Sequence, residues 1–233
     1  MKKTQQKGSK SNDKAWMKWA YVGVALLFAV AMVGTYFSPM FNKGQAVQAG
    51  NVALIGYTIR GEDGRPLITT DQGLLEREYQ KGNYNLLLSR GMEIPAGIEI
   101  PGEEITAIPI VHPPISGFSG FSLLGFEITS MSGGIAGMRP GEMRTISFSY
   151  GENRLEASLS EEDAEGLGLN FTEWEVGDLI PLGLTTSPEI PVGNDTPETP
   201  ALRFGRILAK TPDSLAITYR YGSADITLNS IVR

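Results

Sequence analysis

The stretch that decides the fold occupies residues 123–142 and reads LLGFEITSMSGGIAGMRPGE. It begins within an apolar run at residues 121–124. Residues 128–136 favour a short helix, although two glycines lower the helical propensity there. MRPGE at residues 138–142 has the composition of a tight turn. Residues 143–150 then alternate apolar and polar side chains, which indicates a strand with one buried face carrying Ile146, Phe148 and Tyr150. The stretch therefore predicts a short helix and a turn between two apolar segments.

The segments on either side of this stretch predict further strands. Residues 52–60 (VALIGYTIR) alternate, with Ala53, Ile55, Tyr57 and Ile59 on one face. Glu62-Asp63-Gly64 is a hairpin signal, because Asp and Gly tolerate the positive φ of such turns, and residues 67–70 form the returning strand. Near the C-terminus, three strands in hairpin succession are expected at residues 202–210, 214–221 and 224–232. The fold class expected for the part after residue 42 is mostly β, of the α+β type.

Two regions interrupt this strand pattern. Residues 71–119 include a short helix at 74–81, followed by repeated Ile-Pro units that suit edge strands, and we expect an irregular insertion there. The second region spans residues 152–200. Its first part, residues 152–168, is acidic, and a short helix is expected near residues 160–165. We expect a turn and a strand at residues 171–184 and a Pro-rich loop at 185–200.

The N-terminal part carries a predicted transmembrane anchor. Residues 19–42 contain no charged side chain, and a run of roughly 18–25 apolar residues is long enough to cross a bilayer as a helix. Six lysines precede this run against one acid, whereas Lys43 is the only base close behind it. The positive-inside rule therefore predicts a cytoplasmic N-terminus and an extracytoplasmic C-terminal part. The alternative is a cleaved signal peptide with a weak cleavage site within residues 46–49.

The composition of the chain argues against several kinds of binding and catalytic site in the exported part. The net charge of the chain is −6, which argues against nucleic acid as a partner. The chain has no cysteine and one histidine, His112, which is followed by two prolines and is expected on a surface loop. We therefore expect no metal site, no cofactor, and neither thiol nor histidine-triad catalysis.

The order of four segments resembles the FKBP-type peptidyl-prolyl cis-trans isomerases. They are GYTIRGEDG at residues 56–64, LLGFEITSMSGGIAGMRPGE, RTISFSYG at 144–151, and ADITLNSIV at 224–232. The region at residues 151–222, with its Val176-Gly177-Asp178 turn, is similar to the domain that replaces the flap in one branch of that family. The resemblance implies an FKBP-like β half-barrel with a short helix, formed by residues 51–150 and 223–233, with a small inserted β domain at 151–222. Residues 1–18 would be a basic cytoplasmic head and 43–50 a linker after the anchor.

The resemblance also implies an activity and a site. Rotation about an X-Pro bond has a barrier of roughly 18–20 kcal/mol. An apolar pocket that excludes water favours the twisted amide, which is less polar than the planar one, and no nucleophile or cofactor is required. The residues that the resemblance places in catalysis are Tyr57, Ile128, Met131 and Tyr150, with Ile128 supplying a backbone N–H and Met131 the pocket floor. Those that it places around the substrate are Leu67, Phe121, Phe148 and Leu228.

Two hypotheses for function follow. The first is a membrane-anchored extracytoplasmic prolyl isomerase and chaperone whose partners are exported, unfolded, proline-containing chains and, through the anchor, the bilayer. The second is a catalytically inactive FKBP-like module for binding or envelope structure. Leu67-Ile68 favours the second, because the family has an aromatic residue followed by Asp at these positions. Asn170-Phe171-Thr172 and Asn194-Asp195-Thr196 also match the N-glycosylation acceptor pattern.

Overall fold

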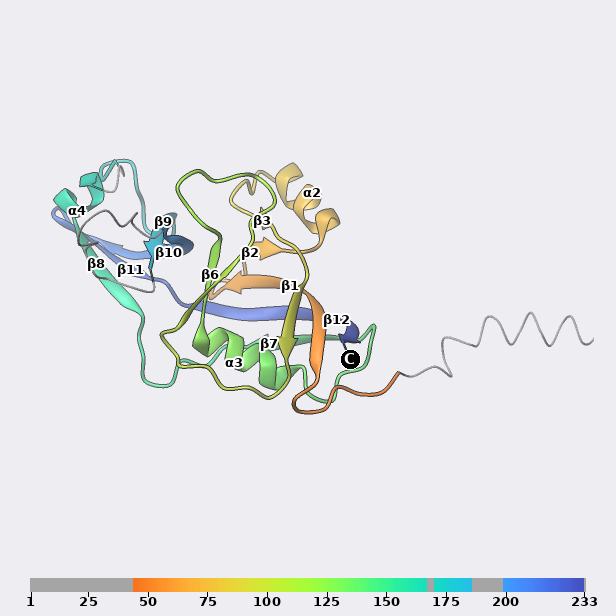
Figure 1. Ribbon diagram of the computed structural model, residues 1–233. Helices are drawn as coiled ribbons and strands as arrows, with labels where there is room; N and C mark the ends of the chain where they lie inside the picture. The colour runs from red at the N-terminus through yellow and green to blue at the C-terminus, as the bar shows by residue number, and fades with distance from the viewer. Residues whose placement is uncertain (1–43, 167–169, 186–198, 233) are drawn as a thin grey trace, which may run out of the picture. The chain divides into compact units, whose positions relative to one another are not determined.

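The computed structural model describes residues 44–166, 170–185 and 199–232, and all of these after Gly44 belong to one compact unit, Gln45–Arg233 (Figure 1). The predicted anchor at residues 19–42 and the second acceptor sequence at Asn194 lie outside the described residues. In the part of the chain that is described, no helix is long and apolar enough to cross a membrane.

The first sheet has β1 (Val52–Gly61) at its centre. Its strand order is β3-β2-β1-β12-β7, formed by β2 (Pro66–Thr69), β3 (Leu87–Leu88), β7 (Met143–Ser147) and β12 (Tyr221–Val232), and β4 (Met92–Pro95) also pairs with β1. The predicted inward face of β1 is confirmed, because Ala53, Ile55, Tyr57 and Ile59 are at most 2% exposed. The predicted turn between β1 and β2 is also present, and Gly64 has the positive φ of 80° that such a turn requires.

The second sheet is arranged around β10 (Ala201–Lys210). Its strand order is β5-β6-β10-β11-β8, and β9 (Leu179–Leu184) also pairs with β10. The other strands are β5 (Ile105–Ile108), β6 (Phe121–Leu124), β8 (Glu156–Ser160) and β11 (Ser214–Thr218). β10 runs parallel to β6 at Leu202 and Phe121. The strands of the predicted inserted region therefore continue a sheet that begins in the preceding part of the chain, an arrangement that no local pattern predicts.

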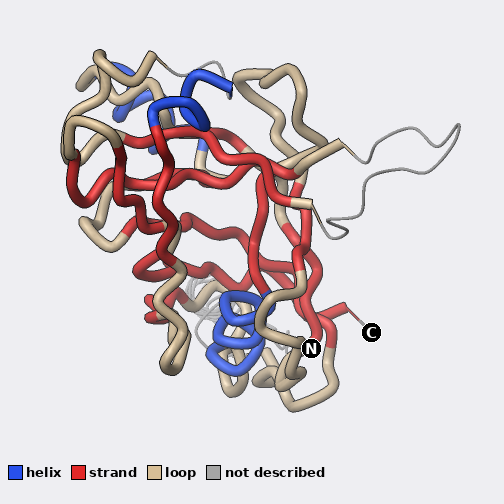
Figure 2. The backbone as a smooth tube through the Cα atoms, turned by 90° about the vertical axis from the view of Figure 1, so that its left-hand side faces the viewer, coloured by secondary structure: helices blue, strands red, loops and turns tan. Residues whose placement is uncertain are grey.

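The described part of the chain contains three helices, which are blue in Figure 2. They are α2 (Gln72–Gln80), α3 (Gly125–Gly134) and α4 (Glu161–Gly166). Asp71 caps α2 by accepting a hydrogen bond from the Leu74 backbone N–H at 3.1 Å. The helix predicted at 128–136 begins three residues earlier, because Glu127 in its first turn accepts the Leu124 N–H at 2.8 Å and so fixes the start of the helix.

Residues 71–119 contain the short helix and the short strands that the sequence predicts, joined by loops. They contain α2, β3, β4 and β5 and contribute to both sheets. The Ile-Pro units do form short strands, and β5 is an edge strand of the second sheet, as their prolines predict. The order of this segment has a tertiary origin, since β3 and β4 are held by β2 and β1, which are distant in sequence.

Two hydrophobic cores stabilise the unit. The larger lies under the first sheet, α3 and β6, and includes side chains from residues 71–119 such as Leu87, Ile94 and Ile108. The smaller is formed by Ala164, Phe171, Ile180, Ile207, Leu215 and Ile217. β10 connects the two cores, because Leu202 and Phe204 belong to the first and Ile207 to the second.

Candidate functional site

The residues that the FKBP resemblance places around a pocket come together, but inside the larger core. Tyr57, Leu67, Phe121, Ile128, Met131 and Leu228 are all members of it, and each is at most 4% exposed. Phe148 is partly buried and packs against the same core. Ile128 is the fourth residue of α3, whose N-cap is Leu124, so helix geometry directs its backbone N–H at the Leu124 carbonyl and not at a bound peptide.

The segment at residues 71–119 closes the space over Tyr57. The Tyr57 hydroxyl lies 2.7 Å from Ser89 Oγ, and Ser89 Oγ donates to the Pro109 carbonyl at 2.7 Å. Burial, opposed in part by the hydrogen bond to Ser89, raises the pKa of Tyr57 to about 12. Tyr57 is therefore a neutral, fully partnered core residue in this conformation.

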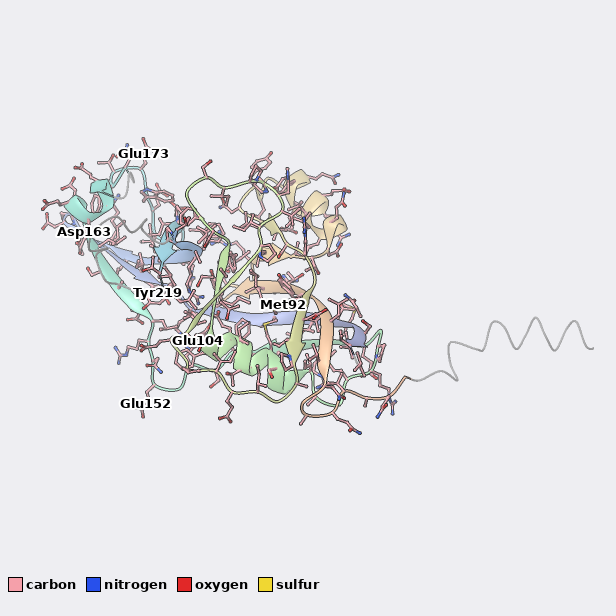
Figure 3. All side chains as sticks on the ribbon, viewed as in Figure 1. Met92, Glu104, Glu152, Asp163, Glu173 and Tyr219 are labelled. Carbon is pink, nitrogen blue, oxygen red and sulfur yellow. The ribbon has the colours of Figure 1, made fainter. Side chains whose placement is uncertain are left out.

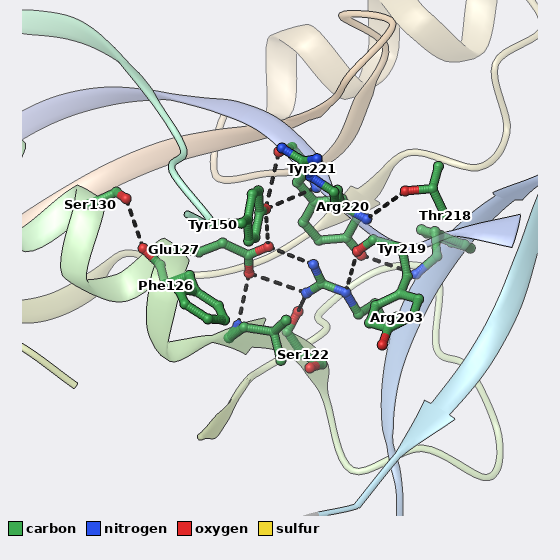
Figure 4. A network of polar contacts seen from close by, with 12 residues as sticks. Ser122, Phe126, Glu127, Ser130, Tyr150, Arg203, Thr218, Tyr219, Arg220 and Tyr221 are labelled. Atoms are coloured by element: carbon green, nitrogen blue, oxygen red, sulfur yellow. Dashed lines mark hydrogen bonds and ion pairs between the residues drawn. The ribbon is translucent and has the colours of Figure 1, made fainter. Parts of the chain in front are cut away.

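Tyr150 belongs to a buried polar network rather than to the apolar core (Figure 4). Its hydroxyl donates to Glu127 Oε1 at 2.6 Å and lies 3.0 Å from the Tyr221 carbonyl. The Arg203 guanidinium reaches both carboxylate oxygens of Glu127, at 2.5 and 3.2 Å, and both side chains are 0% exposed. Arg203 also donates to the Tyr219 and Ser122 carbonyls, at 2.7 and 3.3 Å.

The ionisation states in this network follow from burial and pairing. Burial opposes the charge of Arg203, but the adjacent Glu127 carboxylate holds the pKa of Arg203 above its ordinary value. Burial, and then the Glu127 carboxylate, raise the pKa of Tyr150, and burial raises that of Tyr221. The network therefore contains one ion pair and two neutral phenols. It joins α3 to β10 and to the start of β12, which is a structural role.

An apolar groove is the feature with the character of a binding site. It measures about 270 Å³, and we define it by the residues that line it: Tyr84, Asn85, Leu87, Pro113, Ile115, Trp174, Leu179, Pro181, Leu202 and Phe204. One wall comes from residues 84–115 and the other from Trp174, β9 and β10. Tyr84 is 69% exposed, so a large aromatic ring stands at the edge of the groove.

An acidic hollow adjoins the groove. It has a volume of about 340 Å³ and is lined by Asn85, Glu173, Trp174, Asp178 and Leu179. Asn85, Trp174 and Leu179 line both spaces, so groove and hollow are adjacent. A ligand that lies along both spaces would contact apolar and aromatic side chains in the groove and the Glu173 and Asp178 carboxylates in the hollow.

A larger cleft of about 640 Å³ lies on the outer face of the first sheet, but its charged side chains are already paired with one another. Arg60 donates to Asp225 at 2.7 Å, and the Arg77 guanidinium lies 3.7 Å from the Asp71 carboxylate. Within the described residues, no group of three His, Cys, Asp or Glu side chains is arranged to hold a metal ion. The apolar groove is therefore the better candidate for a ligand site.

No protein-family model matches this chain. No curated protein matches it either. The fold and the groove are thus the basis for assigning a function.

Sequence reasoning missed both the groove and the buried ion pair. Trp174 is the only tryptophan after the predicted anchor, and a lone tryptophan in an acidic segment with Glu173, Glu175 and Asp178 is a signal that could have been used. Tyr84 and Pro113 come from a region with no recognisable pattern. Arg203 and Glu127 are 76 positions apart, and nothing in either local sequence indicates their pairing.

Proposed function

We propose that this chain is a membrane-tethered, extracytoplasmic module that binds extended apolar polypeptide segments in the groove between Tyr84 and Trp174. The observation that carries the proposal is the groove itself, an open apolar and aromatic surface adjacent to an acidic hollow. The tether and the location rest on the apolar run at residues 19–42 and on the lysines before it.

The chemistry of the groove supports an extended peptide as ligand. Aromatic and proline side chains contact apolar side chains without requiring a particular sequence. Pro181 of β9 is paired with Phe204 of β10, so both side chains lie on the sheet face that lines the groove, and a peptide there makes side-chain contacts. Glu173 and Asp178 favour a ligand with a basic residue at that end.

Prolyl isomerisation is the second candidate function. One observation favours it: Tyr57, Phe121, Met131 and Leu228, which the FKBP resemblance groups together, share one cluster between the first sheet and its covering elements. Catalysis there requires residues 71–119 to move away from Tyr57 and expose that cluster.

The binding proposal is tested with the fragment Gln45–Arg233, in which Trp174 is the only tryptophan and reports on the groove directly. A short peptide rich in Leu, Phe and Pro and carrying one Lys should shift the emission of Trp174 on titration. Tyr84→Ala should weaken binding about 5- to 30-fold, the range for loss of an interface aromatic worth about 1–2 kcal/mol. Met143→Ala is the matched control, because Met143 is 76% exposed and does not line the groove.

The outcomes separate the candidates. Unchanged Trp174 emission with a well-folded fragment, or equal affinity for parent and Tyr84→Ala, would refute binding in the groove. Prolyl exchange measured on the same peptide then tests the second candidate. Acceleration that Tyr57→Phe reduces while Tyr84→Ala does not would locate catalysis in the closed cluster, and no acceleration by the parent would leave a binding module.

A further inference from the structure

Asn170-Phe171-Thr172 stands on the surface beside the acidic hollow. Asn170 and Thr172 are exposed, whereas Phe171 between them is 4% exposed and belongs to the smaller core. Lys210 holds the same loop by donating to the Phe171 and Trp174 carbonyls, each at 2.8 Å. The loop therefore has a fixed conformation that presents the Asn and Thr side chains to solvent.

The polar contacts of Asn170 leave one amide hydrogen available. Its Oδ1 accepts the Thr172 hydroxyl at 2.8 Å and the Thr172 N–H at 3.3 Å, and its Nδ2 donates to Glu173 Oε1 at 2.7 Å. A carboxamide nitrogen carries two hydrogens, and the described residues provide a partner for one of them. A substituent can therefore replace one hydrogen while Nδ2 keeps an N–H that can donate to Glu173.

From this geometry we propose that Asn170 is an acceptor for an N-linked glycan. The sequence meets the Asn-X-Ser/Thr requirement, with Phe at the middle position. The side chains of Asn170 and Thr172 that a glycosyltransferase must reach are exposed in the folded protein. The proposal rests on the proposed extracytoplasmic location, because the transfer takes place on that side of the membrane.

The covalent step uses a lipid-linked oligosaccharide phosphate as the donor. The Asn170 Nδ2 lone pair forms a bond to C1 of the first sugar, and the bond from C1 to the phosphate oxygen breaks with its electrons on the phosphate. One Nδ2 proton passes to a carboxylate of the transferase. The product is a secondary amide whose remaining N–H still donates to Glu173, so the loop needs no rearrangement.

The position of the glycan relates it to the groove. Glu173, which Asn170 contacts, and the neighbouring Trp174 both line the acidic hollow, and Glu173 points outward at this end of the protein (Figure 3). A glycan on Asn170 therefore stands at the acidic end of the ligand site, away from Pro113 and Ile115. It adds a hydrophilic group next to the partly exposed Trp174.

The test is mass spectrometry of the full-length protein isolated from the membranes of the cells that make it. We expect a glycopeptide containing Asn170, and enzymatic release of the glycan should convert that asparagine side chain to an aspartate. Thr172→Ala and Asn170→Gln should abolish the glycopeptide. Thr172→Ser keeps the hydroxyl and should retain it, which separates loss of the acceptor from loss of folding.

Protease added to the cytoplasmic face of sealed membranes distinguishes the two ways in which the proposal can fail. A C-terminal part that is protected until the membranes are opened with detergent, with Asn170 unmodified, overturns the glycan and leaves the extracytoplasmic location standing. A part that is digested from the cytoplasmic face overturns the location, and the glycan with it. A glycan that persists in Thr172→Ala would show that attachment occurs elsewhere, and this too overturns the assignment to Asn170.

Discussion

Replacing Glu127 with Gln should destabilise the protein strongly, although the two side chains have nearly the same shape. The Glu127 carboxylate accepts hydrogen bonds from the Leu124 N–H, the Tyr150 hydroxyl and two nitrogens of Arg203. A carboxamide places an NH₂ group where one of these oxygens stood, so donors face donors on that side. Arg203, which is 0% exposed, keeps its charge and loses its counter-ion.

The expected cost follows from that burial. Removing one partner of a buried ion pair typically costs about 3–5 kcal/mol, because an uncompensated charge stays in the interior. For a domain of roughly 150–250 residues this lowers the melting temperature by roughly 6–20 °C. Arg203→Met combined with Glu127→Gln removes both charges, and the double variant should be more stable than the sum of the single effects predicts.

Urea unfolding of the fragment Gln45–Arg233 measures these free energies. Glu152→Gln is the matched control, since Glu152 is exposed at the periphery (Figure 3) and its replacement should stay within about 0.5 kcal/mol of the parent. If Glu127→Gln changed the free energy of unfolding by less than about 1 kcal/mol, or if the cycle were additive, the ion pair would not have the role described.

Three further predictions concern the helix next to this network and the ionisable groups. Gly133→Ala in α3 should stabilise the protein by about 0.5–1 kcal/mol, because no atom lies within 4 Å of the added Cβ. Gly125→Ala should destabilise the protein, because its Cβ would overlap the Pro101 carbonyl oxygen. Chemical unfolding of the two variants measures both effects. Buried Tyr57 has a pKa raised to about 12, so it stays protonated in the folded state while the unfolded phenol ionises. The stability of the protein should therefore fall as the pH rises from about 10 to 12. Unfolding midpoints measured across this range check the direction of the change, and Tyr57→Phe should give a shallower decline. Although partial burial acts to raise the pKa of Asp225, hydrogen bonds from Thr145 and Arg60 hold this pKa below its usual value. The contribution of Asp225 to the free energy of unfolding should therefore be present above about pH 4 and be lost as the pH falls through the lowered pKa. Asp225→Asn should flatten this loss of stability in acid, and an unchanged dependence on pH would contradict the assignment.

Local chemistry along the chain determined the strands, the turns and one face of the first sheet. The alternation in β1, the Asp-Gly turn after it and the strands near the C-terminus depend on side-chain periodicity and on backbone preferences of neighbouring residues. These can be read without knowledge of distant partners. The mostly β fold class follows from them, as do the three short helices to within a few residues.

Tertiary structure alone decided what surrounds these elements. Residues 71–119 have little periodicity of their own, and they are ordered because β1, β2 and β6 provide partners for their backbone groups. The same contacts bury Tyr57 beneath Ser89 and place Tyr84 opposite Trp174, so the predicted pocket is closed and a groove is open elsewhere. Burial and concavity depend on side chains far apart in sequence, and for that reason the pairing of Glu127 with Arg203 and the walls of the groove become visible only in three dimensions.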